Sequence, residues 1–326
     1  MLHARITGTG GFLPETVYTN AHLETMVDTT DEWIRKRTGI GQRHVAGPGE
    51  GASDLAIPAA EEALGNAGVA PADVDLIICC TTTPDYLFPA TACIIQDALG
   101  ARKAAAYDVN AACSGFLYGL TSANAFIVSG MYRTVLVTGT ESATNRLNWQ
   151  KRDTSVLFGD GAGAVVLEAD DSGRGILSTY LGADGSGADL LIRPAGGSKV
   201  LITKDNLDGP ECDVHMKGAE LFKRAAVLFE EAAQKALDRA GLSLEDVDLF
   251  VPHQANARII GAAAKRLGLP EDKVMLNIER VANTTAASIP LALHEAVSEG
   301  RIREGNTVLL ASFGSGLTWG AAVIRW

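Results

Sequence analysis

Short apolar runs without polar alternation recur along the chain, and stretches with helical periodicity separate them. The runs cover 74–80, 134–138, 163–168, 247–252, 307–312 and 320–325. Such runs are typical of strands that are buried on both faces. The helices predicted over 55–67 and 219–240 each end at a glycine, Gly68 or Gly241, which suits a left-handed cap. The alternation of helices and strands predicts an α/β fold with two similar layered units.

The chain contains an internal repeat. Residues 63–76 align without a gap on residues 236–249, an offset of 173, and eight of the fourteen positions are identical. Thr134-Val135-Leu136 matches Thr307-Val308-Leu309 at the same offset. Because two separate matches share one offset, we infer two related halves, residues 1–172 and 173–326. The alternative is an ordinary two-domain α/β protein with a coincidental similarity.

Residues 109–132 carry no charge over 24 positions, which raises the question of a membrane span. Six of these residues are Asn, Ser or Thr and three are Gly, so the run is too polar for a spanning helix. A helix buried on all sides in a large soluble domain fits better. We expect no membrane association.

The composition narrows the function classes. The 326 residues are 47% hydrophobic, and 28 basic against 39 acidic residues give a net charge of −11. This balance argues against a nucleic-acid binder that neutralises phosphates with a basic face. The five cysteines form no CxxC pair, and the first residues show no export signal, so we expect a cytoplasmic protein with reduced thiols.

Cys113 is the cysteine best placed for chemistry. It lies at the start of the uncharged helix, where the helix dipole would lower the thiol pKa and make it a nucleophile. The alternative is a buried thiol used only for packing. Cys79, Cys80 and Cys93 lie in apolar elements, where a thiol usually serves as a small hydrophobe, and Cys212 carries no partner signal.

His253 and Asn283 are the candidates to act with this thiol. His253 follows the buried strand 247–252 and has no second ligand at metal spacing, so we expect an acid/base or hydrogen-bond donor and no metal. The offset of 173 maps Asn110, in the turn that carries Cys113, onto Asn283. Both helix starts could therefore approach one cavity, although Asn283 could instead only cap its helix.

Two glycine-rich segments remain. The first, 158–163, lacks the GxGxxG spacing and precedes a strand, so it is a weak phosphate signal and a tight strand connection is the better interpretation. The second, 313–316, follows a repeat-matched strand. Its exposed backbone N–H groups could face a developing oxyanion.

Together these motifs resemble the β-ketoacyl-[acyl carrier protein] synthase III family of condensing enzymes. The matching segments are NAACSGF around Cys113, VPHQAN around His253, ANTTAAS around Asn283, DEWIRKRTGI at 31–40, FGDGAGA at 158–164 and FGSGLTWG at 313–320. They occur in the family's order, and the likeness runs over residues 1–326. The resemblance implies the thiolase fold, five αβαβα layers built from two duplicated halves, and a homodimer.

The resemblance implies a reaction and its residues. Cys113 would be acylated by a short-chain acyl-CoA, and the acyl group would condense with malonyl-acyl carrier protein as CO2 leaves. His253 and Asn283 would stabilise the enolate, and the backbone N–H groups of Cys113 and Ser315 would hold the oxyanion. No cofactor or metal would be needed, since acyl-CoA and malonyl-acyl carrier protein are substrates.

The resemblance also assigns binding residues. Trp33, Arg37 and Arg152 would bind CoA, and Phe88 and Ala143 would shape the acyl pocket. The acidic carrier protein would dock on Lys223, Arg224, Arg258, Lys265 and Arg266.

The chain departs from the family's motifs at four positions. Ala282, Thr285, Ser315 and Asp153 replace residues that are usual there. No departure removes a reactive group, but they leave a starter-unit ketosynthase or acyltransferase of a secondary-metabolite pathway as an alternative. Thiolases with a second catalytic cysteine, elongating synthases with two histidines and longer plant-type polyketide synthases fit less well. An inactive partner subunit would be expected to have lost the nucleophile.

Overall fold

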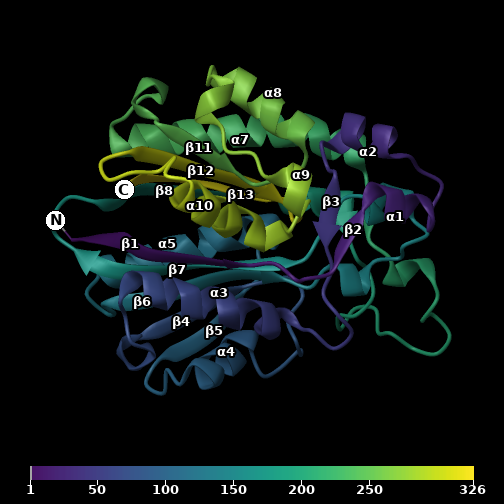
Figure 1. The fold of residues 1–326 in the computed structure, drawn as a ribbon, viewed down its shortest axis with the longest axis horizontal. Helices are drawn as coiled ribbons and strands as arrows, with labels where there is room; N and C mark the ends of the chain where they lie inside the picture. The colour runs from purple at the N-terminus through teal and green to yellow at the C-terminus, as the bar shows by residue number, and fades with distance from the viewer. Residues whose placement is uncertain (1) are drawn as a thin grey trace.

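The computed structural model describes residues 2–326, which form five stacked layers (Figure 1). The outer layers are α3 (Ala52–Ala67) with α4 (Thr91–Leu99), and α7 (Gly218–Ala240) with α8 (Ala257–Leu267). The central layer is α5 (Gly115–Val128) with α10 (Ser288–Ser298). One sheet separates each outer layer from the centre, so the order of layers is αβαβα.

The two sheets have corresponding strand orders. The first runs β1 (His3–Phe12), β7 (Gly161–Asp170), β6 (Thr134–Glu141), β4 (Leu76–Cys80), β5 (Ala105–Val109). The second runs β8 (Gly175–Ala183), β13 (Thr318–Arg325), β12 (Thr307–Gly314), β11 (Leu249–Pro252). β4 is parallel to β5 and β6, and β11 is parallel to β12, while the remaining pairs of the two sheets are antiparallel.

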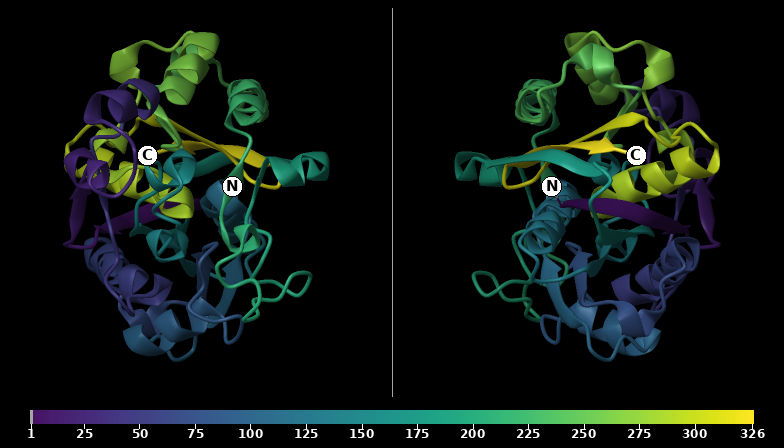
Figure 2. Two further views of the ribbon diagram at one scale, coloured as in Figure 1. Left: turned by 90° about the vertical axis from the view of Figure 1, so that its right-hand side faces the viewer. Right: turned by 90° about the vertical axis from the view of Figure 1, so that its left-hand side faces the viewer.

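Short elements complete the chain. They are β2 (Val17–Thr19), α1 (Asn20–Glu24), α2 (Asp31–Thr38), β3 (Gln42–His44), α6 (Arg152–Ser155), β9 (Leu191–Ile192), β10 (His215–Met216) and α9 (Ile278–Val281). The segment after β8, which includes β9 and β10, projects from one side of the layers (Figure 2). Within residues 2–326, no helix is long and apolar enough to cross a membrane.

The offset of 173 relates structural elements beyond the matched sequence. β6 and β12 begin 173 residues apart, and so do α5 and α10. The 3₁₀ turns before these central helices, Ala112–Ser114 and Thr285–Ala287, differ by the same number. Ala286 therefore occupies in the second half the position that Cys113 occupies in the first. The predicted division after residue 172 falls between β7 and β8, and it stays a prediction.

The predicted helices and strands are present, with shifted ends. The runs at 74–80 and 247–252 begin as strands two residues later than predicted, because a 3₁₀ turn precedes each one. β1, β5 and β8 lie outside the apolar runs that predicted strands. Cys93 is exposed on α4, so its assignment as a buried hydrophobe was wrong. Its neighbours Ala92 and Ile95 lie on the buried face of the same helix.

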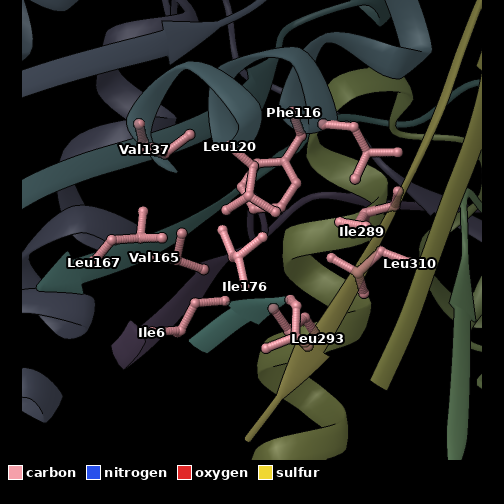
Figure 3. Packing of buried hydrophobic residues seen from close by; sticks show 14 of the residues in the cluster. Ile6, Phe116, Leu120, Val137, Val165, Leu167, Ile176, Ile289, Leu293 and Leu310 are labelled. Atoms are coloured by element: carbon pink, nitrogen blue, oxygen red, sulfur yellow. The ribbon is translucent and has the colours of Figure 1, made fainter. Parts of the chain in front are cut away.

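The largest core lies between the two sheets. Phe116 and Leu120 of α5 pack there with Ile289 and Leu293 of α10, and both sheets add aliphatic side chains (Figure 3). Each such side chain, when fully buried, contributes about 2 kcal/mol of hydrophobic stabilisation. The uncharged run is thus part of a buried central layer and not a membrane span.

Glycines let α3 approach β1 closely. A Cβ on Gly10 would lie 2.1 Å from the carbonyl oxygen of Ala59, and one on Gly8 would lie 2.2 Å from that of Ala63. Both oxygens belong to helix backbone, which cannot move away alone. The outer helix is therefore in contact with the strand backbone itself.

We expect Gly10→Ala to lower the free energy of unfolding by about 3 kcal/mol, because the added methyl overpacks this contact. Chemical denaturation followed by circular dichroism measures the change. Gly65→Ala is the matched control: Gly65 lies on the exposed side of α3, and a methyl group added there would have nothing within 4 Å. It should be neutral or stabilising. Equal denaturation midpoints for Gly10→Ala and the unmodified protein would contradict the contact.

Candidate active site

The turn that carries Cys113 is fastened to the second sheet. Ser312 Oγ donates to the carbonyl oxygen of Cys113 at 2.8 Å, and Thr318 Oγ1 donates to that of Ala111 at 2.8 Å. Gly314 packs so closely that a Cβ there would lie 2.8 Å from Cys113 N. These contacts join the first half to the end of β12 and the start of β13 at Cys113.

His253 directly follows β11 in the second sheet. Its N–H donates to the carbonyl oxygen of Ala311 at 2.9 Å, and its side chain is 1% exposed. Gln254 anchors the turn with its side chain, donating to the carbonyl of Pro252 and accepting from the N–H of Asn277. These contacts fix the turn from which the His253 imidazole extends.

Asn283 is held from both sides by the segment 157–159. Its N–H donates to the carbonyl of Leu157 at 3.0 Å, and its carbonyl accepts from Gly159 N–H at 3.1 Å. Its side-chain Oδ1 accepts from Thr285 N–H at 2.9 Å. This is the capping contact that the sequence left as an alternative, and it leaves the amide NH2 group as the free end of the side chain.

The glycine-rich segment at 158–163 makes a strand connection, as the sequence favoured. Asp160 is buried and accepts from the N–H groups of Ala46 (2.7 Å) and Thr144 (2.9 Å). A Cβ on Gly159 would lie 2.7 Å from the carbonyl of Val281, so glycine lets the segment pass beside the Asn283 turn. The segment thus supports Asn283.

The thiol lies where two cavities meet. The first, of about 390 Å³, is lined by Cys113, His253 and Asn283 together with Trp33 and Arg37. The second, of about 340 Å³, is lined by Cys113 and by Ala143 and Ser315. The structure therefore brings the three predicted reactive residues to one cavity and gives the thiol access to another.

Burial determines the protonation state of the Cys113 thiol. Burial raises the pKa of Cys113 to about 12, and the negative charge of Glu141 acts in the same direction. Hydrogen bonds from the backbone N–H groups of Cys113 and Ser315 oppose the rise. The prediction of a lowered pKa was wrong, because desolvation outweighs the start of the helix. The two opposing N–H groups are those expected to hold an oxyanion.

Burial also keeps the imidazole neutral. It lowers the pKa of His253 from 6.5 to about 3. At neutral pH the site accordingly contains a thiol and an uncharged imidazole, which can donate one N–H and accept at the other ring nitrogen. Its Nδ1 is buried and has no hydrogen-bond partner within residues 2–326.

Glu141 is a site residue that the sequence did not reveal. It is fully buried at the end of β6 and accepts from Thr82 N–H, Thr82 Oγ1 and Thr83 Oγ1. Burial raises its pKa, and these hydrogen bonds oppose the rise. In the first half, two strands end at an acidic residue, β6 at Glu141 and β7 at Asp170. No pattern in the sequence shows which of the two lies buried at the site.

Two of the departures from the family's motifs lie at strained backbone positions beside Asn283. Ala282 has φ 60° and Thr285 has φ 45°, a region that disfavours side chains. Ala112 has φ 49° and is related to Thr285 by the offset of 173. The two turns facing the cavity therefore share one unusual conformation, which is typical of functional turns.

The residues expected to bind CoA lie together. The guanidinium of Arg37 is 4.8 Å from the centre of the Trp33 ring, and that of Arg152 is 4.7 Å from it. Arg37 and Trp33 line the first cavity. Arg152 lines a neighbouring polar cavity of about 510 Å³, and Asp153 lines both cavities. Asn256 Nδ2 donates to the carbonyl of Arg37 at 3.0 Å and so links this cluster to the turn after His253.

The remaining predicted residues are more dispersed. Phe88 is 85% exposed and lies outside the linings of both cavities, whereas Ala143 lines the second.

Of the five basic residues expected to receive a carrier, only Arg258 lines the first cavity, where its guanidinium lies over Phe222. Arg224 pairs with Glu220 and Asp184, and Arg266 pairs with Glu230. Lys223 borders a small apolar pocket beside Arg224, and Lys265 lies in the last turn of α8.

Within residues 2–326, no three His, Cys, Asp or Glu side chains cluster in a way that could hold a metal ion. A buried cysteine at the junction of two related α/β units, facing a histidine and an amide, defines an acyltransferase of the thiolase fold.

Comparison with known proteins gives the family. Residues 107–185 match the family model for 3-oxoacyl-[acyl-carrier-protein] synthase III, and residues 237–326 match the model for its C-terminal part. The chain belongs to the β-ketoacyl-[acyl-carrier-protein] synthase III family, as the sequence motifs predicted.

Individual relatives match over nearly the whole chain. A β-ketoacyl-[acyl-carrier-protein] synthase III from Symbiobacterium thermophilum is 52% identical over 98% of this chain and 97% of its own. The crystal structure of the Aquifex aeolicus VF5 3-oxoacyl-[acyl-carrier-protein] synthase III has a TM-score of 0.93 and 45% identity, covering 99% of this chain and 100% of that one. The priming β-ketosynthase of the R1128 polyketide pathway has a TM-score of 0.92 and 36% identity, covering 98% and 95%.

We expect the neutral imidazole to make stability depend on pH. Below pH 6.5 the imidazole of His253 is protonated in the unfolded chain, whereas in the folded protein it stays neutral down to about pH 3. The free energy of unfolding therefore falls as the pH falls through this window. The contribution between pH 6.5 and 5 is about 2 kcal/mol. Denaturation of the unmodified protein and of His253→Gln, each at pH 7 and pH 5, measures it. The same loss in both proteins would show that His253 is not held neutral.

Proposed function

We propose that this protein starts type II fatty-acid synthesis. It transfers a short acyl group from CoA to Cys113 and condenses it with malonyl-acyl carrier protein to give a β-ketoacyl-acyl carrier protein. The observation that carries the proposal is the Cys113 thiol at the junction of two cavities, in one of which it meets His253 and Asn283. One cavity suits the incoming thioester and the other the acyl chain.

The first step is a thioester exchange. Cys113 Sγ attacks the carbonyl carbon of the acyl-CoA, the bond from that carbon to the CoA sulfur breaks, and the thiol proton passes through His253 to that sulfur. Since the thiol and the imidazole are both neutral at rest, attack and proton transfer proceed together. The backbone N–H groups of Cys113 and Ser315 stabilise the negative charge that develops on the carbonyl oxygen.

The second step is a decarboxylative condensation. The malonyl group loses CO2, and the electrons of the broken C–C bond form an enolate whose oxygen accepts from His253 Nε2 and Asn283 Nδ2. The contact from Thr285 N–H to Asn283 Oδ1 supports this role, because it directs the donor end of the amide toward the cavity. The enolate carbon then attacks the acyl-Cys113 carbonyl, the bond from that carbon to Sγ breaks, and the Cys113 thiolate takes up a proton from solvent to restore the resting thiol.

CoA binding and dimerisation belong to the same proposal. Trp33, Arg37 and Arg152 bind the adenine and phosphates, which is supported by the stacked guanidiniums around the indole ring. Tyr86, Leu87 and Phe88 form an exposed apolar segment, 61%, 84% and 85% exposed. A homodimer would cover it and bring Phe88 of each copy to the other's acyl pocket.

The carrier docks on the face of α7 and α8 at the mouth of the first cavity. Three of the basic residues form no ion pair within residues 2–326, so their charges are available to the carrier: Lys223, Arg258 and Lys265. Arg224 and Arg266 would exchange their internal acidic partners for those of the carrier.

The two halves, 1–172 and 173–326, contribute Cys113 and the His253–Asn283 pair respectively. The reaction needs no cofactor, and its soluble substrates favour the cytoplasm as its location.

The alternative of a secondary-metabolite enzyme is not favoured. Synthases named for this reaction match the chain at about half identity over nearly its whole length, whereas the priming polyketide ketosynthase matches at 36%.

We expect Cys113→Ala to abolish condensation of acyl-CoA with malonyl-acyl carrier protein, because no acyl-enzyme can form. Intact-protein mass spectrometry after incubation with acetyl-CoA should show one acetyl adduct on the unmodified protein and none on the variant. Cys93→Ala, which removes an exposed thiol on α4, is the control and should still acylate. A condensing Cys113→Ala protein would refute the assignment.

The substitution Asn283→Asp distinguishes hydrogen-bond donation by the amide NH2 group from capping of the turn by Oδ1. Asp keeps the oxygen that accepts from Thr285 N–H but has no NH2 group. We expect it, like Asn283→Ala, to slow decarboxylation of malonyl-acyl carrier protein by roughly 100-fold, while acylation of Cys113 changes less. Radiolabelled CO2 release and adduct formation measure the two steps. If Asn283→Asp kept normal decarboxylation, the amide would serve only as a cap.

A further inference from the structure

The second cavity contains two cations. It opens from Cys113 on the side of Ala143 and Ser315, and Arg146 and Arg193 both line it. The rest of the lining is apolar or uncharged. No carboxylate is among these lining residues. A cavity that held only an alkyl chain would have no use for two guanidiniums.

Neither arginine has an acidic partner within residues 2–326. Arg146 Nη2 donates to the carbonyl of Pro84 at 3.4 Å, and Arg193 Nε donates to the carbonyl of Cys212 at 2.8 Å. Neither takes part in an ion pair, although the chain carries eleven more acidic than basic side chains. Most N–H groups of the two guanidiniums are thus free for another acceptor.

The charge of Arg193 acts on Arg146. Arg146 is exposed at the cavity wall, yet partial desolvation of its guanidinium lowers its pKa, and the charge of Arg193 lowers this pKa further. The buried carboxylate of Glu141 acts in the opposite direction but has its own hydrogen bonds to Thr82 and Thr83. An anion in the cavity would relieve the repulsion between the arginines.

We propose that this cavity selects an acyl chain with a terminal carboxylate, so that the primer is the CoA thioester of a short dicarboxylic acid. The inference rests on the proposed function and specifies its acyl substrate. Guanidinium and carboxylate form two parallel hydrogen bonds, the geometry that Arg provides best. The thioester end reacts at Cys113 as before, and the carboxylate at the other end keeps its bonds and its charge.

Two acyl-CoA substrates of equal chain length test the inference. Succinyl-CoA and butanoyl-CoA each carry four acyl carbons, and only succinyl-CoA ends in a carboxylate. The rate of Cys113 acylation is measured for both by intact-protein mass spectrometry. We expect Arg146→Met and Arg193→Met each to lower the succinyl-to-butanoyl rate ratio by roughly 10-fold or more. Arg146→Lys should retain part of the preference for succinyl-CoA, because lysine keeps the positive charge but lacks the paired N–H groups of a guanidinium.

Arg37→Met is the matched control on the CoA side. It should slow both substrates equally and leave the ratio unchanged, because both carry the same CoA. A ratio unaffected by the neutral substitutions in the second cavity would overturn the inference, and so would an unmodified enzyme that acquires butanoyl but no succinyl adduct. Failure to acquire any acyl adduct would instead refute the proposed function.

The malonyl carboxylate is the other possible source of the same chemistry. If the arginines held it, Arg146→Met and Arg193→Met would raise the KM for malonyl-acyl carrier protein with butanoyl-loaded enzyme and leave the acylation ratio unchanged. That pattern would overturn the proposal of a carboxylate-bearing primer.

Discussion

The reactive centre depends on the hydrogen bonds that cross from one half of the molecule to the other. Ser312 and Thr318, in the second sheet, fix the carbonyls of Cys113 and Ala111 in the first half. These contacts fix the Cys113 turn to the sheet that also carries His253, which follows a neighbouring strand. The five layers provide the rigid frame, and these side chains set the register between its halves.

Burial is the second constraint. A thiol and an imidazole placed in the core are held neutral, since each charged form would lose its water. The thiol and the imidazole therefore form no ion pair at rest. In the proposed reaction, two backbone N–H groups and the Asn283 amide would stabilise the charge as it develops. This arrangement suits an intermediate whose charge is transient.

Much of this could be predicted from the sequence, for definable reasons. Eight identities in fourteen residues reveal the repeat, and the repeat predicts that Asn283 lies near Cys113 independently of any family motif. The thiol pKa was mispredicted, because the position of a residue at a helix start is visible in the sequence whereas its burial is not. Arg146 and Arg193 could not be found, because they lie in separate loops that only the folded chain brings to one cavity.

The duplicated frame is chemically asymmetric. The position that holds Cys113 in one half holds Ala286 in the other, although the turns around them share the same backbone conformation. One chain can thus carry only one acyl group on this frame at a time. The first product, CoA, must depart before the second substrate reacts at the same sulfur, so the enzyme should obey ping-pong kinetics, with each substrate competing for the form that awaits the other.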